Sequence, residues 1–107
     1  MLFRSVIGLM KTLAIELGPF NVRANALCPG PVEGERMNYV ADREAQQKGR
    51  TREDVLAEYA SGSSMLKLVR PEDVAEMAVF LASDKATLIS GQVIAVDGHT
   101  QNPEPKP

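Results

Sequence analysis

Two short strand-like segments on either side of a helix most constrain the fold of this 107-residue chain. Residues 21–28 carry apolar or small side chains at the even positions and are followed by Pro29-Gly30-Pro31, which predicts a short strand. Val93–Val96 is a continuous apolar run stopped by Asp97-Gly98, which is typical of a strand buried on both faces. We therefore expect an α/β fold whose two strands are parallel neighbours joined by a right-handed helical connection.

The two apolar helices that accompany these strands have clear signals at their ends. From Val6 to Leu17 the apolar positions share a wide helical face, so we expect a helix that is buried on more than one side and ended by Gly18-Pro19. Pro71 is followed by two acidic residues that suit a helix N-terminus, and the helix it begins should run to about Ala82.

The polar stretch between the first strand and the second apolar helix also has helical character. Met37 to Gln47 predicts a helix ended by Gly49, and Thr51 predicts the cap of a further helix that runs to about Tyr59. The Ser-Gly-Ser-Ser sequence at residues 61–64 predicts a loop, because small polar side chains compete with helical hydrogen bonds.

Composition excludes several classes of partner. The 12 basic and 14 acidic residues interleave, so no charged surface suits nucleic acid or anionic lipid. The longest apolar run is Met77–Ala82, far short of the roughly 20 residues of a membrane span, and no secretory signal is apparent. Cys28 is the single cysteine, which excludes an internal disulfide or a cysteine-based metal site and suits a reducing compartment. We expect a soluble cytoplasmic protein without a metal.

Four segments of the chain resemble, in the right order, the C-terminal half of the short-chain dehydrogenase/reductase family. They are Leu13–Gly18, Val22–Val32, Pro71–Ala75 with Phe80–Ser83, and Ser90–Gly98. The resemblance implies the C-terminal part of a doubly wound parallel sheet of the Rossmann type, with a nicotinamide cofactor across the strand ends. It also implies NAD or NADP as the cofactor of the full-length parent, a small-molecule alcohol or carbonyl as substrate, and a homo-oligomer, commonly a homotetramer.

The resemblance implies a cofactor-binding loop made of Pro29, Gly30, Pro31 and Val32. In the family, the backbone of the corresponding loop approaches the nicotinamide. Glycine permits that approach because it has no side chain, and backbone groups at Val32 could hydrogen-bond the carboxamide. The alternative is a turn that merely ends a strand.

Two positions near this loop and one near the C-terminus stand out. Gly34 occupies a place where the family usually has a threonine, which removes a hydroxyl contact to the cofactor. Arg36 has two interpretations, a substitute that binds phosphate or a solvated surface arginine. His99 stands where the family often has glycine, and a lone histidine near a chain end is typical of a surface or interface position, not of a catalyst.

The resemblance also divides the chain into parts. Residues 33–69 take the place of the family's variable substrate lid, a mobile cover that excludes water, the alternative being a solvated helical pair. Residues 101–107 contain three prolines and no large apolar side chain, which predicts a disordered or extended tail. Because the match begins at Val6, we interpret residues 1–5 as a non-native leader and residues 6–100 as the C-terminal part of an oxidoreductase domain.

The family's catalytic residues have no counterpart in this sequence. A Y-x-x-x-K pair with an upstream serine is credited with catalysis, and counting back from Val6 puts the lysine near Phe3 and the tyrosine before Met1. The glycine-rich pyrophosphate turn would lie further upstream. We name no catalytic residue, and the choices between NAD and NADP and among substrates stay open.

Two hypotheses for function follow. The first is a fragment of an oxidoreductase that transfers a hydride between a nicotinamide cofactor and an alcohol or carbonyl, inactive alone. The second is a non-enzymatic oligomerisation or interaction module that pairs through the first helix and the last strand. Either way, an exposed hydrophobic sheet edge should leave the isolated chain poorly folded or oligomeric.

Overall fold

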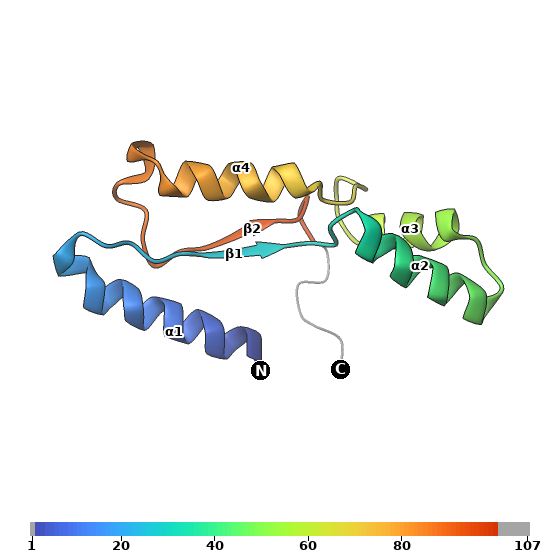
Figure 1. Ribbon diagram of the computed structural model, residues 1–107, viewed down its shortest axis with the longest axis horizontal. Helices are drawn as coiled ribbons and strands as arrows, with labels where there is room; N and C mark the ends of the chain where they lie inside the picture. The colour runs from blue at the N-terminus through green and yellow to red at the C-terminus, as the bar shows by residue number, and fades with distance from the viewer. Residues whose placement is uncertain (1, 101–107) are drawn as a thin grey trace. The chain divides into compact units, whose positions relative to one another are not determined.

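The structure is a computed structural model that describes residues 2–100 (Figure 1). The chain divides into two compact units. Among the described residues, the first comprises 2–28 and 75–95, and the second comprises 29–74 and 96–100. The expected tail at residues 101–107 lies outside the described residues.

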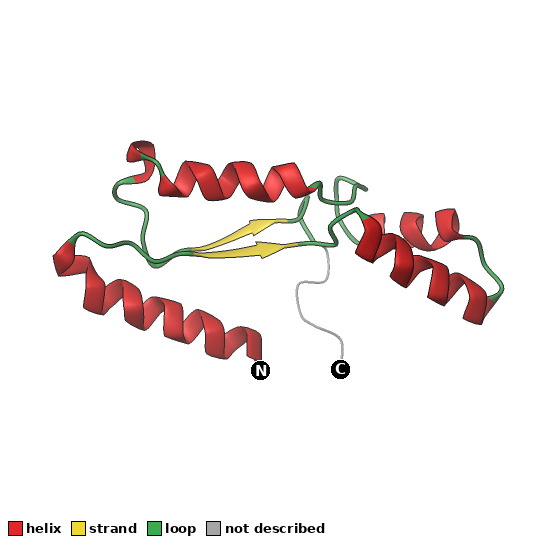
Figure 2. Ribbon diagram, in the orientation of Figure 1, coloured by secondary structure: helices red, strands yellow, loops and turns green. Residues whose placement is uncertain are grey.

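β1 (Ala26–Pro29) and β2 (Val93–Val96) form a two-stranded sheet, and all but the last residue of each strand belong to the first unit (Figure 2). The amide of Ala26 donates to the carbonyl of Gln92 at 2.9 Å, and the amide of Gly30 donates to the carbonyl of Val96 at 3.0 Å. Because both partners advance by the same number of residues, the strands are parallel. The predicted parallel neighbours of an α/β fold are confirmed.

β1 is shorter than the expected strand over residues 21–28, because side-chain hydrogen bonds replace regular backbone pairing before Ala26. Asn21 has a left-handed φ of 63° and ends the short 3-10 helix η1 (Gly18–Phe20). The amide of Ala24 donates to Ser90 Oγ at 3.2 Å, and Asn25 Nδ2 donates to the carbonyl of Ile89 at 2.9 Å. Asn25 Oδ1 in turn accepts from the amide of Gln92 at 3.1 Å. These side-chain bonds satisfy the backbone before the regular pairing begins at Ala26.

Helices α1 (Leu2–Leu17) and α4 (Pro71–Ala82) flank these strands, and α4 has the expected bounds. α1 and the part of α4 from Ala75 lie on opposite sides of the two strands (Figure 2). The Arg23 guanidinium donates to the carbonyls of Leu81 and Ser83 and so satisfies the C-terminal end of α4. At the other end of α4, the amide of Arg70 donates to the Asp73 carboxylate at 3.0 Å.

The expected burial of α1 and β2 is wrong for the described residues. Of the α1 residues whose burial is described, 4–17, only Met10 is buried, whereas Leu9 and Ile15 are 61% and 76% exposed. In β2, exposed and half-buried residues alternate, and Val93 is 41% exposed. The cause is the small size of the sheet, since two strands and one crossing helix supply no layer that covers the outer faces of α1 and β2. α1 also begins at Leu2, earlier than the expected Val6.

The second unit contains a helical hairpin of α2 (Glu35–Lys48) and α3 (Arg52–Ala60). Its small core consists of Ala41, Ala45 and Val55, with Leu56 packed against them. Both expected turn signals are confirmed. Gly49 caps α2 with a left-handed φ of 64°, and the Thr51 hydroxyl accepts from the amide of Asp54 at 3.1 Å.

Within residues 2–100, no helix is long and apolar enough to cross a membrane. The interpretation of residues 1–5 as a leader stays a prediction. Leu2–Ser5 continue α1 as helix, and Met1 lies outside the described residues.

Candidate functional site

The predicted cofactor loop lies at the carboxyl end of β1, inside the second unit. Pro29 is the last residue of the strand, and three residues later Val32 forms a parallel bridge to Val69. Two backbone bonds hold this bridge. The amide of Glu33 donates to the carbonyl of Val69, and the amide of Val69 donates to the carbonyl of Pro31, both at 2.8 Å. The loop therefore extends past the strand in a fixed conformation, at the sheet edge where open α/β sheets bind ligands.

Gly30 has a structural reason to be glycine. A β-carbon at Gly30 would lie 2.9 Å from the β-carbon and 3.2 Å from the α-carbon of Asp97, which follows β2. The close approach of the two strand ends therefore requires a residue without a side chain. The sequence interpretation attributed this glycine to the approach of a cofactor, and the contact with Asp97 explains it without one.

The backbone amide and carbonyl of Val32 are the groups of the loop that are available to bind a ligand. The bridge to Val69 uses the carbonyl of Pro31 and the amide of Glu33, so the amide and carbonyl of Val32 point away from it. Within residues 2–100, neither group has a hydrogen-bond partner. Val32 also borders a hollow of about 440 Å³. Its lining comprises Val32, Glu33, Gly34, Glu35, Arg36, Met37 and Val40.

Gly34 and Arg36 both border this hollow. Gly34 precedes α2 with a φ of 143°, a conformation that side-chain-bearing residues rarely adopt. The residue that lacks the family's hydroxyl therefore serves a backbone turn into the helix. Arg36 is exposed in the first turn of α2, and the structure leaves both of its interpretations open.

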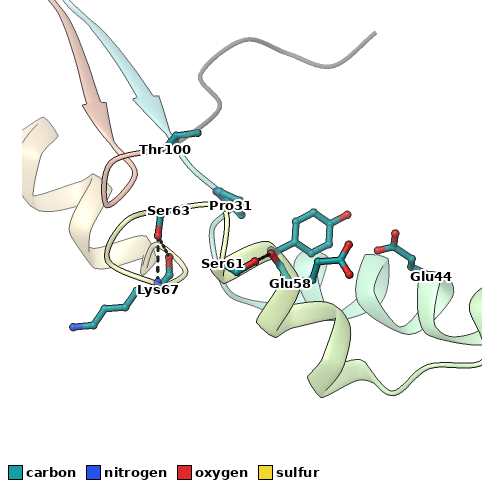
Figure 3. Close-up of a pocket in the computed structure, with 9 residues that line it drawn as sticks. Pro31, Glu44, Glu58, Ser61, Ser63, Lys67 and Thr100 are labelled. Carbon is teal, nitrogen blue, oxygen red and sulfur yellow. Dashed lines mark hydrogen bonds between the residues drawn. The ribbon is translucent and has the colours of Figure 1, made fainter.

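Pro31 opens onto a second and larger hollow of about 620 Å³ (Figure 3). The other lining residues are Glu44, Glu58, Tyr59, Ser61, Gly62, Ser63, Lys67 and Thr100. They come from α2, from α3 and the loop after it, and from the segment after β2. The lining combines hydroxyls, carboxylates and one ammonium group, so the hollow is polar and contains both hydrogen-bond donors and acceptors.

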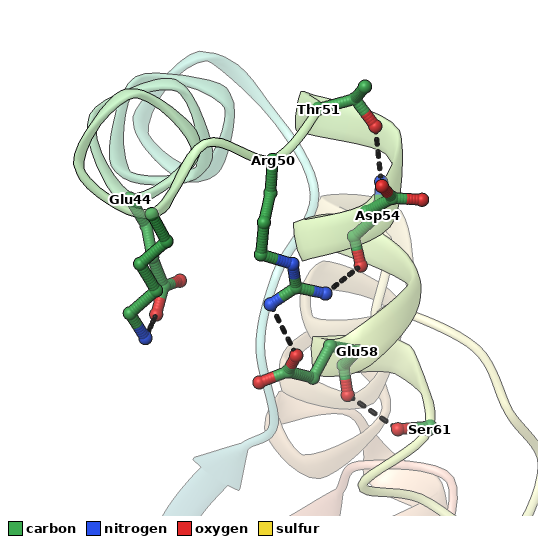
Figure 4. A network of polar contacts seen from close by, with 7 residues as sticks. Glu44, Arg50, Thr51, Asp54, Glu58 and Ser61 are labelled. Atoms are coloured by element: carbon green, nitrogen blue, oxygen red, sulfur yellow. Dashed lines mark hydrogen bonds and ion pairs between the residues drawn. The ribbon is translucent and has the colours of Figure 1, made fainter.

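Ion pairs neutralise the carboxylates of this second hollow. Lys48 Nζ lies 2.9 Å from Glu44 Oε1, and this bond lowers the pKa of Glu44. Arg50 binds Glu58 at 2.6 Å and also donates to the carbonyl of Asp54 at 3.3 Å (Figure 4). The carboxylates that the hairpin contributes to this hollow are thus already paired with basic side chains.

The segment after β2 is a part of the site that the sequence analysis missed. Asp97 Oδ1 accepts from the amide of His99 at 2.8 Å, and Asp97 Oδ2 accepts from the Thr100 hydroxyl at 2.9 Å. The bond from Thr100, supported by the backbone amides, lowers the pKa of Asp97. A signal was present, because Asp97 follows β2 as Pro29 ends β1, and the carboxyl ends of neighbouring parallel strands meet at one edge.

His99 lies on the surface, as the sequence predicted, and its side chain has a defined partner. Its Nδ1 lies 2.5 Å from the hydroxyl oxygen of Ser64, in the loop after α3. Within residues 2–100, no group of three or more His, Cys, Asp or Glu side chains is placed to hold a metal ion.

The parallel strands, the helix that connects them, and the loop and helical hairpin that follow the first strand in the chain define the C-terminal portion of a Rossmann-type α/β domain. The family model described as enoyl-(acyl carrier protein) reductase matches residues 4–99. The chain belongs to the short-chain dehydrogenase/reductase family.

Relatives with known names or structures agree with this assignment. The oxidoreductase UcpA of Escherichia coli is 36% identical over 100 residues, which cover 94% of this chain and 37% of the relative. The 3-oxoacyl-[acyl-carrier-protein] reductase FabG of Thermotoga maritima is 37% identical over 93 residues, covering 87% of this chain and 33% of the relative. The structure of L-sorbose reductase from Gluconobacter frateurii, complexed with NADPH and L-sorbose, superposes with a TM-score of 0.85 at 26% identity. That superposition covers 94% of this chain and 39% of the reductase.

The chain therefore spans between 33% and 39% of the length of these relatives. The predicted family and the predicted partial Rossmann fold are confirmed, and the chain is homologous to a segment of oxidoreductases.

Proposed function

We propose that this chain is the nicotinamide-side and lid portion of an oxidoreductase that transfers a hydride between NAD(P) and a small alcohol or carbonyl compound. The observation that carries the proposal is the backbone of Val32, whose unengaged amide and carbonyl border a hollow beyond the end of β1. A carboxamide has one donor and one acceptor group, so it matches this pair of backbone groups. The bound nicotinamide would supply or accept the hydride.

The chain's own residues have binding and covering roles in this proposal. Pro29, Gly30, Pro31 and Val32 form a rigid loop, because the bridge to Val69 and the contact with Asp97 hold it on two sides. Preorganised backbone groups bind a ligand without an ordering cost. The hairpin of α2 and α3 would cover the reacting centre and exclude water, as lids do in many enzymes.

The proton transfer has to come from residues beyond these 107. The sequence contains two tyrosines, Tyr39 and Tyr59, and the residues four positions later are Arg43 and Ser63, so neither belongs to a Y-x-x-x-K pair. We therefore propose that the chain is inactive alone and contributes to a site completed by a segment homologous to the N-terminal part of its relatives.

The exposed apolar side chains of α1 support this view. Val6, Leu9, Leu13 and Ile15 are between 38% and 76% exposed, whereas large apolar side chains are usually buried in stable domains. We propose that the missing portion of the domain covers them, in a soluble cytoplasmic homo-oligomer. The same surface favours the second candidate function, a non-enzymatic module that pairs with another protein or with itself.

Complementation with a relative tests the proposal. The part of Escherichia coli UcpA that precedes the matched segment would be expressed with this chain, and the purified mixture titrated with NADPH and NAD by calorimetry. We expect the two polypeptides to co-purify and to bind a nicotinamide cofactor that neither binds alone. Co-purification without cofactor binding would refute the proposed site. A stable self-assembled oligomer that ignores the UcpA segment would favour the interaction module.

A further inference from the structure

The rear end of the lid, residues 63–69, is tied to the segment after β2. Ser63 forms an antiparallel bridge to Thr100. The amide of Ser64 donates to the carbonyl of His99 at 2.8 Å, and the amide of Met65 donates to the carbonyl of Gly98 at 3.2 Å. Ser64 and His99 are joined a second time by the 2.5 Å contact of hydroxyl and imidazole. Two residues 35 positions apart are thus connected through both backbone and side chain.

The backbone at His99 indicates that its side chain matters. Gly98 and His99 both have left-handed backbones, with φ of 67° and 71°. Glycine adopts this conformation without strain, whereas a histidine there is strained and persists only where surrounding contacts hold it. The Asp97 carboxylate supplies one such contact by accepting from the His99 amide at 2.8 Å, and the Ser64 hydroxyl supplies the other.

Ser63 strengthens the same connection from the lid side. Its side chain is buried, 5% exposed, and its hydroxyl lies 3.2 Å from the carbonyl of Ala60 and 3.3 Å from both the carbonyl and the amide of Lys67. Ser63 therefore holds the loop after α3 together through hydrogen bonds within the loop, and Ser64 attaches this loop to His99 in the segment after β2.

The front end of the lid has the opposite character. Gly34 has a φ of 143°, and a β-carbon built there would meet nothing within 4 Å. Its conformation is open almost only to glycine, and the space beside its α-carbon is unfilled. The hairpin that follows has its own core around Val55. It also has its own ion pair, in which the Arg52 guanidinium donates two hydrogen bonds of 2.6 Å to the Asp42 carboxylate. These contacts hold α2 and α3 together as one unit.

We propose that Ser64 and His99 form a positioning latch that fixes residues 63–69 to the end of β2, so that lid movement is confined to the α2–α3 hairpin between Gly34 and Gly62. The latch itself depends only on the contacts above, and its effect on a substrate rests on the proposed function. The serine hydroxyl can donate to a neutral imidazole or accept from a protonated one, so the latch stays closed in either state. It works as a fixed anchor.

Amide hydrogen exchange of the full chain, followed by nuclear magnetic resonance, tests the latch without any cofactor. The variants are Ser64→Ala, His99→Asn and the double variant, with Ser64→Thr as the control that retains the hydroxyl. Asparagine is chosen because it tolerates the left-handed backbone of residue 99. The observed amides are those of Ser64 and Met65, with the amide of Val55 inside the hairpin as the internal reference.

We expect Ser64→Ala and His99→Asn each to speed exchange at Ser64 and Met65 by about 5-fold, the value of one ordinary hydrogen bond. The double variant should be no faster than either single variant, Ser64→Thr should restore slow exchange, and Val55 should be unchanged in all. The imidazole ¹⁵N chemical shifts should report a hydrogen-bonded Nδ1 in the unsubstituted chain, and this signature should be lost in Ser64→Ala.

Three outcomes would overturn the latch. The first is an exchange rate in Ser64→Ala equal to that of the unsubstituted chain. The second is an effect in the double variant equal to the sum of the two single effects. The third is fast exchange of the Ser64 and Met65 amides in the unsubstituted chain while the Val55 amide is protected. Because no cofactor enters the measurement, failure of the proposed function leaves these outcomes unaffected.

Discussion

Gly30 and Asp97 lie so close that a β-carbon on Gly30 would be 2.9 Å from the β-carbon of Asp97. The contact joins the ends of the two parallel strands, at the edge where the loop and the lid begin. It explains why this position excludes side chains before any ligand is considered.

Gly30→Ala should therefore destabilise the chain. We expect a loss of about 1–3 kcal/mol in the free energy of unfolding, the usual cost of forcing an extra carbon into a packed site. Urea unfolding followed by circular dichroism measures it. Gly8→Ala is the matched control, because Gly8 lies in α1 with nothing within 4 Å of the added carbon, and helix propensity should raise stability by roughly 0.5–1 kcal/mol. Equal effects of the two substitutions would contradict the steric explanation.

Val32 offers a test of the proposed cofactor contact. Val32→Pro removes the amide hydrogen, whereas Val32→Ala keeps it and shortens the side chain. In the complemented protein, we expect the proline variant to bind the nicotinamide cofactor about 5-fold more weakly, as for the loss of one hydrogen bond. The alanine variant should bind nearly as well as the parent. Calorimetric titration compares them, and equal affinities would exclude the Val32 amide from the site.

The ion pair of Asp42 and Arg52 should make the hairpin sensitive to acid. The hydrogen bond from Arg52 lowers the pKa of Asp42 below its ordinary value. A lowered carboxyl pKa stabilises the folded state above the unfolded pKa, and this stabilisation is lost as the pH falls through the folded pKa. We expect the amides of α2 and α3 to lose protection below about pH 4, where aspartate ordinarily titrates.

Asp42→Asn is the variant that checks this dependence. It should be less protected than the parent at neutral pH and change less on acidification, as followed by hydrogen exchange between neutral and acidic pH. Glu44 is also held below its ordinary pKa by Lys48, so some dependence should remain. An unchanged acid profile in Asp42→Asn would refute the role of this pair.

The exposed apolar side chains of α1 should decide solubility and association. Changing Leu9 and Ile15, which are 61% and 76% exposed, to serine should leave the helix content of the chain unchanged. The double change should reduce self-association in analytical ultracentrifugation and abolish co-purification with the UcpA segment. Leu88→Ser is the control, because Leu88 is 97% exposed and lies outside α1. If Leu88→Ser had the same effect, association would be nonspecific.

Local signals in the sequence were sufficient for most secondary structure and for the family. The bounds of α4 follow from Pro71 and the acidic residues after it, and the caps at Gly49 and Thr51 follow from the chemistry of single residues. Each of these signals acts within one helical turn, so no distant residue is needed to interpret it. The position of the loop from Pro29 to Val32 at a strand end was predictable for the same reason.

The sequence by itself determined the element types, the parallel pairing and the place of the candidate loop in the chain. Tertiary structure decided the burial of α1 and β2, the reason for Gly30 and the partner of His99. These depend on residues far apart in the chain, as with Asp97 beside Gly30 and Ser64 beside His99. An apolar periodicity predicts which face of a helix can be buried. Whether that face is buried depends on the presence of a neighbouring layer of secondary structure.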